Sequence, residues 1–189
     1  MIYVISDCHF GHMQILKYCK RPFKDVEEMD AELIRRWNEV VLPSDTIYHI
    51  GDFKMGATPD TFQPVGSRSI TEKAFIDSIV KQLNGNKIWL KGDHREPPNT
   101  VDNAKLQYEG YNFVMVHEPE KAFDAGFVPS ACNWLLHGHK HNHELQDFPF
   151  FNRRKHRFNV SAELINYRPV PLATLVDIIN GHELRMGCL

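Results

Sequence analysis

Residues 2–9 read IYVISDCH, an apolar and β-branched run that ends abruptly in an acid, a thiol and an imidazole. Ile2–Ser6 is typical of a buried strand, and Asp7 and His9 then fall in the loop that follows it. In open α/β sheets, ligands bind in the crevice beyond the carboxyl ends of the strands. Asp7 and His9 are therefore the first candidates for a functional site.

Four more apolar runs end in the same way, each followed by a carboxylate or an imidazole. We predict strands at Thr46–Ile50, Lys87–Lys91, Phe113–Val116 and Trp134–Leu136. The polar side chains that follow these strands are Asp52, then Asp93 with His94, then His117, then His139 with His141. Five strand ends thus converge on one candidate site. Imidazole and carboxylate together are the ligands of divalent metals such as zinc, manganese, iron, cobalt and nickel.

The remaining chain alternates helix, loop and strand signals. Apolar residues at helical spacing predict amphipathic helices over Asp25–Val41 and Thr71–Leu83, with a loop rich in Gly, Pro, Ser and Thr at Lys54–Ile70. Later strands are expected at Arg157–Val160 and Leu175–Ile179. Because no internal repeat or low-complexity tract divides the chain, we expect one domain over residues 1–189.

The composition is that of an ordinary globular protein, with 42% hydrophobic and 24% charged residues and a formal charge of -2. It excludes disordered, collagen-like and coiled-coil chains. No apolar run approaches the roughly 20 residues of a membrane helix, so we expect a cytoplasmic protein with no membrane partner. The four cysteines form no CxxC pair, which argues against a zinc ribbon, whereas eleven histidines are an excess that suggests metal.

The five motifs, in this order, resemble those of the calcineurin-like metallophosphoesterases, which carry D-x-H, G-D, G-N-H-[D/E], a lone His and G-H-x-H. The matching residues are Asp7-Cys8-His9, Gly51-Asp52, Gly92-Asp93-His94-Arg95, His117 and Gly138-His139-Lys140-His141. A compact branch of bacterial, archaeal and phage phosphohydrolases is similar at His9-Phe10-Gly11-His12, Tyr18-Cys19 and Arg21-Pro22-Phe23. The resemblance implies a four-layer α-β-β-α sandwich of two mixed β-sheets flanked by helices.

The resemblance also implies a dinuclear metal centre. One metal would be held by Asp7, His9, Asp52 and His141, and the second by Asp52, Asp93, His117 and His139, with the two oxygens of Asp52 each facing one cation. Two such cations share a hydroxide that attacks phosphorus in line. His94 would give a proton to the leaving oxygen. Manganese is expected first, and iron, nickel, zinc or cobalt also suit the ligands.

Two positions depart from the family pattern. Asp93 stands where the motif has Asn, an exchange that a chemically altered asparagine would also give, and Arg95 stands where it has an acid. The extra carboxylate of Asp93 brings the summed charge of the centre to about zero, which favours a monoanionic diester over a dianionic monoester. Arg95 is either a bidentate phosphate donor or a solvated arginine, and His12 is a second candidate for substrate contact.

We therefore predict a phosphodiesterase acting on a nucleotide or nucleic-acid-type ester. The alternatives are a phosphomonoesterase acting on a small metabolite or phosphoprotein and, in another class, a degenerate member of the fold that only binds. The Lys54–Ile70 loop and the Pro97–Gln107 segment are expected to select the leaving group. The basic run at 153–157 is either a phosphate contact or a solvated loop. His137 and His143 are either partners of the ligands or loop residues.

Overall fold

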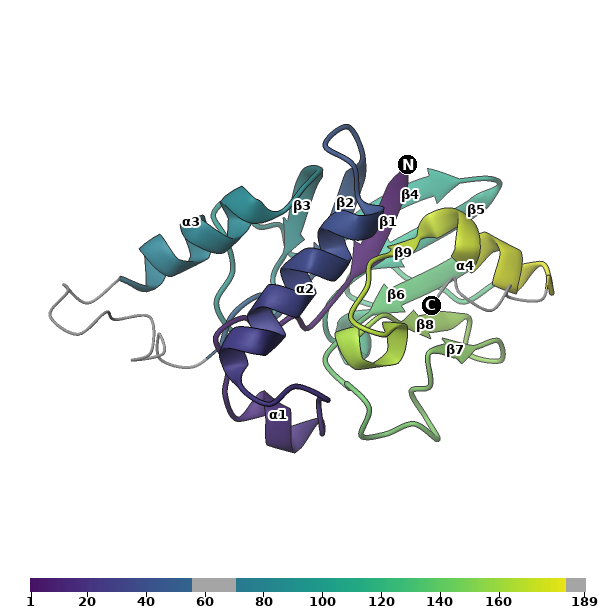
Figure 1. The fold of residues 1–189 in the computed structure, drawn as a ribbon. Helices are drawn as coiled ribbons and strands as arrows, with labels where there is room; N and C mark the ends of the chain where they lie inside the picture. The colour runs from purple at the N-terminus through teal and green to yellow at the C-terminus, as the bar shows by residue number, and fades with distance from the viewer. Residues whose placement is uncertain (56–70, 183–189) are drawn as a thin grey trace, which may run out of the picture.

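The computed structural model describes residues 1–55 and 71–182, which form two β-sheets lying face to face with helices outside them (Figure 1). The first sheet has the order β3-β2-β1-β9. Its strands are β1 (Ile2–Ile5), β2 (Thr46–Ile50), β3 (Asn86–Leu90) and β9 (Val170–Pro171). β1, β2 and β3 run parallel and β9 runs antiparallel to β1.

The second sheet has the order β4-β5-β6-β8-β7. Its strands are β4 (Ala104–Tyr108), β5 (Tyr111–Met115), β6 (Asn133–His137), β7 (Phe151–Asn152) and β8 (Arg157–Asn159). β5, β6 and β8 are parallel, with antiparallel strands at both edges. Two mixed sheets with flanking helices confirm the architecture that the sequence resemblance implies.

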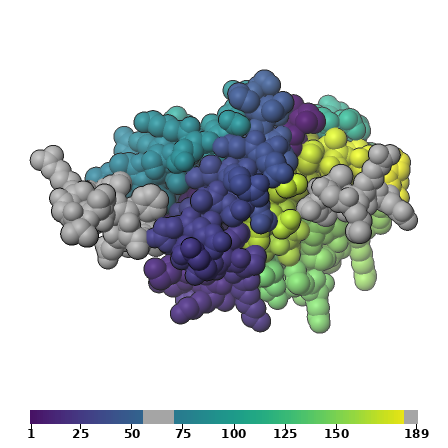
Figure 2. Space-filling model, in the orientation of Figure 1, coloured from purple at the N-terminus to yellow at the C-terminus, as the bar shows by residue number. Residues whose placement is uncertain are grey.

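Four α-helices and two 3-10 turns complete the described residues. They are α1 (Ile15–Tyr18), α2 (Val26–Val40), α3 (Glu72–Gln82), α4 (Leu172–Ile179), η2 (Pro119–Lys121) and η3 (Ala162–Ile165). The Asp25 side chain accepts the Glu28 N–H and the Thr71 side chain accepts the Ala74 N–H, so both long helices begin at capping residues. No helix within the described ranges is long and apolar enough to cross a membrane. Residues of α1 and α2 occupy the middle of the face shown in Figure 2.

The cores on the two faces of the second sheet follow the period of two of a β-strand. Phe113 and Met115 of β5 point into the main core between the sheets. Val114 and Val116 point outward into a smaller cluster, where they pack with Ala122, Ala125 and Phe127, which follow η2. The middle of the sheet, at the carboxyl halves of β5 and β6, is thus buried on both faces.

The two sheets meet where the site residues follow β1 and β8. Ser6 forms a parallel bridge with Ser161, and its backbone N–H donates to the Val160 carbonyl. The Ser6 hydroxyl donates to the Ile50 carbonyl at 2.5 Å. These bonds hold the carboxyl ends of three parallel strands at one edge.

One expectation about the later elements was wrong. Leu175–Ile179 is part of helix α4 and not a strand, because a short, wholly apolar run has no periodicity that separates a buried helix from a buried strand. The segment Pro97–Gln107 runs into β4, which begins at Ala104. Most of the expected Lys54–Ile70 loop, at 56–70, lies outside the described residues.

Candidate metal centre

The structure brings all seven predicted metal ligands together at the strand ends. Of the five groups of three in the described residues whose ligand atoms lie within 4.8 Å of one another, two divide six of these ligands between them. We call Asp7, His9 and His141 the inner half-site, and Asp93, His117 and His139 the outer half-site. Asp52 lies between them, grouped with His9 on one side and with His117 on the other.

Asp52 faces both half-sites with a single oxygen. Its Oδ2 lies 3.5 Å from Nε2 of His9 and 3.3 Å from Nε2 of His117. Its Oδ1 accepts the backbone N–H groups of Asp93, at 2.7 Å, and His94, at 3.1 Å. Two backbone N–H groups thus hold Oδ1, while Oδ2 faces the imidazoles on both sides; that each oxygen faces one cation stays a prediction.

The Glu96 side chain holds the backbone of the Asp52 loop. Its carboxylate accepts the backbone N–H groups of Asp52 and Phe53. Burial raises the pKa of Glu96 to about 8. The acid that the family motif places directly after its histidine thus stands one residue later in this chain, after Arg95.

Asp7 is held in a similar way. Its Oδ2 accepts the Ser161 hydroxyl at 2.9 Å, and both of its oxygens lie within 3.2 Å of the His139 backbone nitrogen. Its Oδ1 lies 3.5 Å from Nε2 of His141. One carboxylate oxygen is therefore left to face the imidazoles of the centre.

Hydrogen bonds at Nδ1 turn two of the histidines toward the centre. His117 donates from Nδ1 to the Ile50 carbonyl at 2.8 Å, and His141 donates from Nδ1 to the Glu163 carboxylate at 3.1 Å. In both rings Nε2 is left to face the carboxylates. A partner that fixes the tautomer and orientation of a ligating histidine is a regular feature of metal sites.

Glu163 and Arg21 form a buried brace that our sequence reasoning missed. Their side chains are 2% and 0% exposed, and Arg21 donates to Glu163 at 2.8 and 2.6 Å. Arg21 also donates to the backbone carbonyls of Asp7 and Cys8. One guanidinium thus ties the loop of Asp7 to the acid that orients His141. Its signal in the sequence was Glu163 itself, a further polar residue shortly after a predicted strand.

The ligand loops have an unusual backbone. Asp7, His9, Asp52, His139 and His141 all have positive φ, between 46° and 68°. Residues other than glycine seldom adopt this region, at a cost of about 1–3 kcal/mol each, and such residues cluster at functional sites. Five strained ligand residues at one edge point to a site maintained for chemistry.

Two motif glycines make room for the carboxylates. A Cβ at Gly92 would lie 2.3 Å from Oδ1 of Asp52, and one at Gly138 would lie 2.2 Å from Oδ2 of Asp7. No side chain fits at these distances. The glycines of the G-D-H and G-H-x-H motifs therefore serve close packing against Asp52 and Asp7.

Opposed charges dominate the electrostatics of the centre. Burial lowers the pKa of His117 and of His141. At His117 the negative charges of Asp52 and Asp7 have the larger, opposite effect. At His141 the charges of Asp7 and Glu163 do the same. The pKa rises to about 9 for His117 and to about 11 for His141. Burial raises the pKa of Asp52, yet His117 and His9 lower it well below its ordinary value. The site therefore attracts positive charge strongly.

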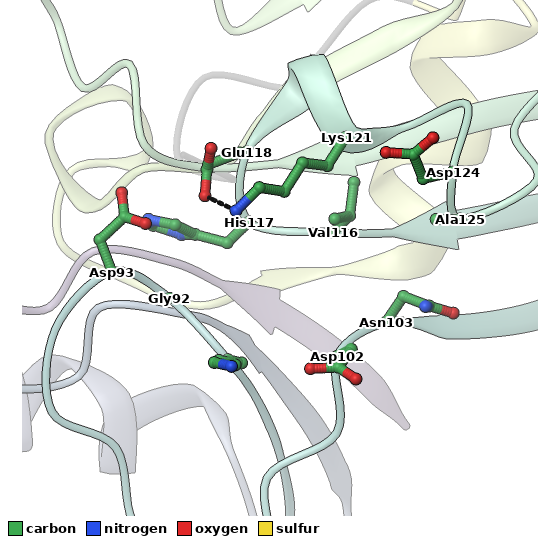
Figure 3. Close-up of a pocket in the computed structure, with 11 residues that line it drawn as sticks. Gly92, Asp93, Asp102, Asn103, Val116, His117, Glu118, Lys121, Asp124 and Ala125 are labelled. Atoms are coloured by element: carbon green, nitrogen blue, oxygen red, sulfur yellow. Dashed lines mark hydrogen bonds and ion pairs between the residues drawn. The ribbon is translucent and has the colours of Figure 1, made fainter.

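A polar pocket of about 470 Å³ opens beside the outer half-site (Figure 3). We call it the Glu118 pocket, because Glu118, directly after His117, lies there with Asp93 and pairs with Lys121. Burial and the neighbouring Glu118 raise the pKa of Asp93. Glu118 is a second residue that our sequence reasoning missed, and its only sequence signal was its place beside His117.

A second hollow, of about 290 Å³, lies beside the inner half-site. We call it the His12 hollow. The residues that line it are His9, His12, Ile15, Tyr18, Cys19, Met55, His94, His141 and His143. His12 is buried, and burial lowers its pKa to about 4. His94 is half-buried, with Nε2 3.7 Å from Oδ2 of Asp52.

The Arg95 side chain pairs with helix α3 and not with the residues of the candidate centre. Its Nε lies 3.1 Å from the Glu72 carboxylate at the start of α3, and its side chain is 70% exposed. It lines neither the His12 hollow nor the Glu118 pocket. Its proposed contact with a phosphate stays a prediction, and in this structure its partner is Glu72.

The other candidates have structural contacts. His137 is buried and donates to the Gly138 carbonyl, while the His143 ring lies 3.6 Å from the Cys19 sulfur. In the basic run, Arg153 donates to carbonyls at the end of α4, and Arg157 stacks on Phe148 with 4.0 Å between guanidinium and ring centre. These contacts favour the structural interpretation of the run.

The five ordered motifs, the two mixed sheets and the shared Asp52 oxygen define a class of protein, the calcineurin-like metallophosphoesterases. Within the described residues, each motif supplies ligand atoms to the same strand-end site.

Comparisons with known proteins identify proteins similar to this chain, although no family profile matches it. Uncharacterized protein MJ1445 of Methanocaldococcus jannaschii is 36% identical over 178 residues, covering 94% of this chain and 90% of that protein. Protein AQ665 of Aquifex aeolicus, of unknown function, has a TM-score of 0.66 at 22% identity, over 94% of this chain and 98% of that one. The phosphoesterase YfcE of E. coli has a TM-score of 0.39 at 15% identity, over 90% and 81%. The chain belongs to the same family as the M. jannaschii protein, and it shares the fold of the A. aeolicus protein.

Proposed function

We propose that this protein is a phosphodiesterase that uses two divalent cations and acts on a nucleotide or nucleic-acid-type ester. The observation that carries the proposal is the pair of three-ligand half-sites that share Oδ2 of Asp52, with His94 beside that oxygen. Two ligand sets that share the Asp52 carboxylate would suit a pair of cations of the kind that two-metal phosphoesterases use.

The residues fit such cations. Both ring nitrogens of His9 and Nε2 of His117 are buried without a hydrogen-bond partner, and the two Nε2 atoms face the Asp52 carboxylate. Buried imidazole nitrogens normally have partners, so a ligand on them resolves an otherwise costly arrangement. Asp7, His9, Asp52 and His141 would hold one cation, and Asp52, Asp93, His117 and His139 the other. When bound, the cations activate water for attack and neutralise charge on the phosphoryl oxygens.

The chain's own groups position this chemistry. The backbone N–H groups of Asp93 and His94 hold the Asp52 carboxylate in place. The brace of Arg21 and Glu163 holds the His141 ring. The His94 side chain is 30% exposed. Its ring can therefore reach a bound substrate and donate a proton to the leaving oxygen.

The charge around the outer half-site supports a diester. Asp93 and Glu118 place two carboxylates beside His117, where the family pattern supplies a neutral Asn at position 93. Additional negative charge disfavours a dianionic phosphate monoester more than a monoanionic diester. A diester is therefore the favoured substrate, and manganese is the first metal to test among manganese, iron, nickel, zinc and cobalt.

The test is a metal-reconstituted activity panel. Metal-depleted protein, loaded with each cation in turn, is assayed with bis(4-nitrophenyl) phosphate, 4-nitrophenyl phosphate, cyclic nucleotides and single-stranded oligonucleotides. We expect hydrolysis of diesters that saturates at two cations per chain. Faster hydrolysis of the monoester would instead identify a phosphomonoesterase, and no turnover with any cation would identify a binding module.

A further inference from the structure

The His12 hollow differs in chemistry from the Glu118 pocket on the other side of the centre. Among the residues that the structure describes, 1–55 and 71–182, no lysine, arginine, aspartate or glutamate lines the hollow, whereas Lys91, Lys121, Asp102 and Asp124 line the pocket. A second phosphate or a carboxylate placed in the hollow would lose its hydration without gaining a lysine or arginine partner from this lining. The hollow therefore suits an uncharged group.

The position of His94 identifies which part of a substrate lies in this hollow. His94 lines the hollow and does not line the Glu118 pocket. In the proposed reaction His94 gives its proton to the departing oxygen, and a proton donor must lie within hydrogen-bond reach of that oxygen. The leaving group is thus the part that enters the hollow, and the retained part lies elsewhere.

The walls of the hollow favour a flat ring. The rings of His12 and Tyr18 lie edge to face with 6.4 Å between their centres, and Ile15 and Met55 add apolar surface. His12 is 4% exposed and Tyr18 is 63% exposed, so one ring forms a fixed wall and the other an accessible rim. Aromatic side chains bind nucleobases by stacking, whatever the base.

From these features we infer that the His12 hollow binds the nucleoside leaving group of a phosphodiester, with its base against His12 and Tyr18. The inference rests on the proposed function and names the side of the ester bond that the enzyme recognises. The oxygen of water bonds to phosphorus, the P–O bond to the nucleoside breaks, and His94 protonates the departing oxygen. The products are a free nucleoside and a phosphate monoester of the other alcohol. A volume of about 290 Å³ is near the roughly 300 Å³ lower limit of small-ligand sites, so it suits one nucleoside.

A nucleoside 5′-methyl phosphate tests this directly, because both of its alcohols are primary and either can leave. We expect wild-type protein to release mainly nucleoside and methyl phosphate, and little methanol and nucleotide. Tyr18→Ala should lower the ratio of the two product pairs at least about fivefold, the low end of base stacking on an aromatic side chain. Tyr18→Phe, which keeps the ring, should preserve the ratio. Phe123→Ala is the matched control, since Phe123 is 72% exposed and lines neither the hollow nor the Glu118 pocket.

The product ratio is internal to one reaction, so lower metal content or partial unfolding of a variant does not move it. Release of mainly methanol by wild type overturns the inference, as does a ratio unchanged in both Tyr18→Ala and His12→Ala. So does failure to cleave the nucleoside ester when bis(4-nitrophenyl) phosphate is hydrolysed. If wild type hydrolyses neither ester, the proposed function fails first and the inference with it.

Discussion

The two half-sites contain similar ligands, yet they differ in how the fold holds them. In the inner half-site the side chains of Asp7, His9 and His141 are 0%, 2% and 11% exposed. In the outer half-site His117 is also buried, at 3% exposed, but Asp93 and His139 are 40% and 34% exposed.

Their supports differ as well. Arg21, Glu163 and Ser161 brace the inner ligands with buried hydrogen bonds. The His139 ring lies 3.0 Å from Asp93, whose other neighbour is the acid Glu118. The comparison indicates that the inner half-site is organised before a cation arrives, whereas the outer one is open to solvent and substrate. We therefore expect the inner cation to be retained longer.

The largest effect should come from the residue that both half-sites share. Asp52→Asn removes the charge from the oxygen that faces His9 and His117, so neither cation keeps its common ligand. We expect activity to fall by more than the roughly 100-fold that the loss of an outer-shell partner costs. Elemental analysis should find fewer than two metals per chain. A variant that kept both metals and full activity would show that Asp52 does not join the half-sites.

The second-largest effect should be a fall in kcat without a loss of bound metal. His94→Ala removes the proposed proton donor, which contributes roughly 10²- to 10⁴-fold in comparable reactions. We expect kcat for a poor leaving group such as a nucleoside to fall within that range. Activity on a nitrophenyl ester, whose leaving group needs no proton, should fall less. An equal fall for both substrates, or a parallel loss of metal, would assign His94 to metal binding.

A matched pair of variants tests whether the inner brace matters more than the acid beside the outer half-site. Glu163→Gln weakens the orientation of His141 and should cost about 10- to 100-fold in affinity for one cation. Glu118→Gln makes the same chemical change beside the more exposed ligands and should cost less. Competition with a fluorescent chelator measures both. Equal losses would remove the distinction between a braced and an open half-site.

A smaller effect is expected at the residue that departs from the family pattern. Asp93→Asn removes a partly exposed charge and should weaken the outer cation by roughly two- to fivefold, the scale of about 0.5–1 kcal/mol. We also expect the ratio of monoester to diester activity to rise. Calorimetric metal titration and paired kinetics provide the measurements. An unchanged affinity and an unchanged ratio would leave the acid at position 93 without a role in selectivity.

The smallest effect on activity is expected at Asp30, which accepts the Gly11 N–H beneath the His9 loop. Burial raises the pKa of Asp30 from 3.8 to about 7, so the folded protein holds this proton more tightly than the unfolded chain. Stability from this group is complete below pH 4 and is lost as pH rises toward 7. The side chain of Asp30→Asn stays neutral at every pH. The free energy of unfolding of this variant, relative to wild type, should therefore rise by a few kcal/mol between pH 4 and pH 7. Denaturant unfolding at pH 4 and pH 8 measures this, and a pH-independent difference would contradict it.

The sequence predicted most of the fold and the membership of the site because its signals are local. Each strand before a ligand is a short apolar run, and Asp25 and Thr71 mark the starts of the long helices. Leu175–Ile179 was misassigned because a wholly apolar run has the same pattern in a buried helix and a buried strand.

The sequence alone therefore determined which side chains meet at the strand ends, because parallel strands bring their carboxyl ends to one edge whatever lies between them. Only the tertiary structure decided how those side chains are held. Arg21 and Glu163 are 142 residues apart, and a contact over that separation leaves no periodic trace in the chain. A single oxygen of Asp52 faces both half-sites, and this too depends on where distant loops meet. The same holds for the His12 hollow and the Glu118 pocket on either side of the centre.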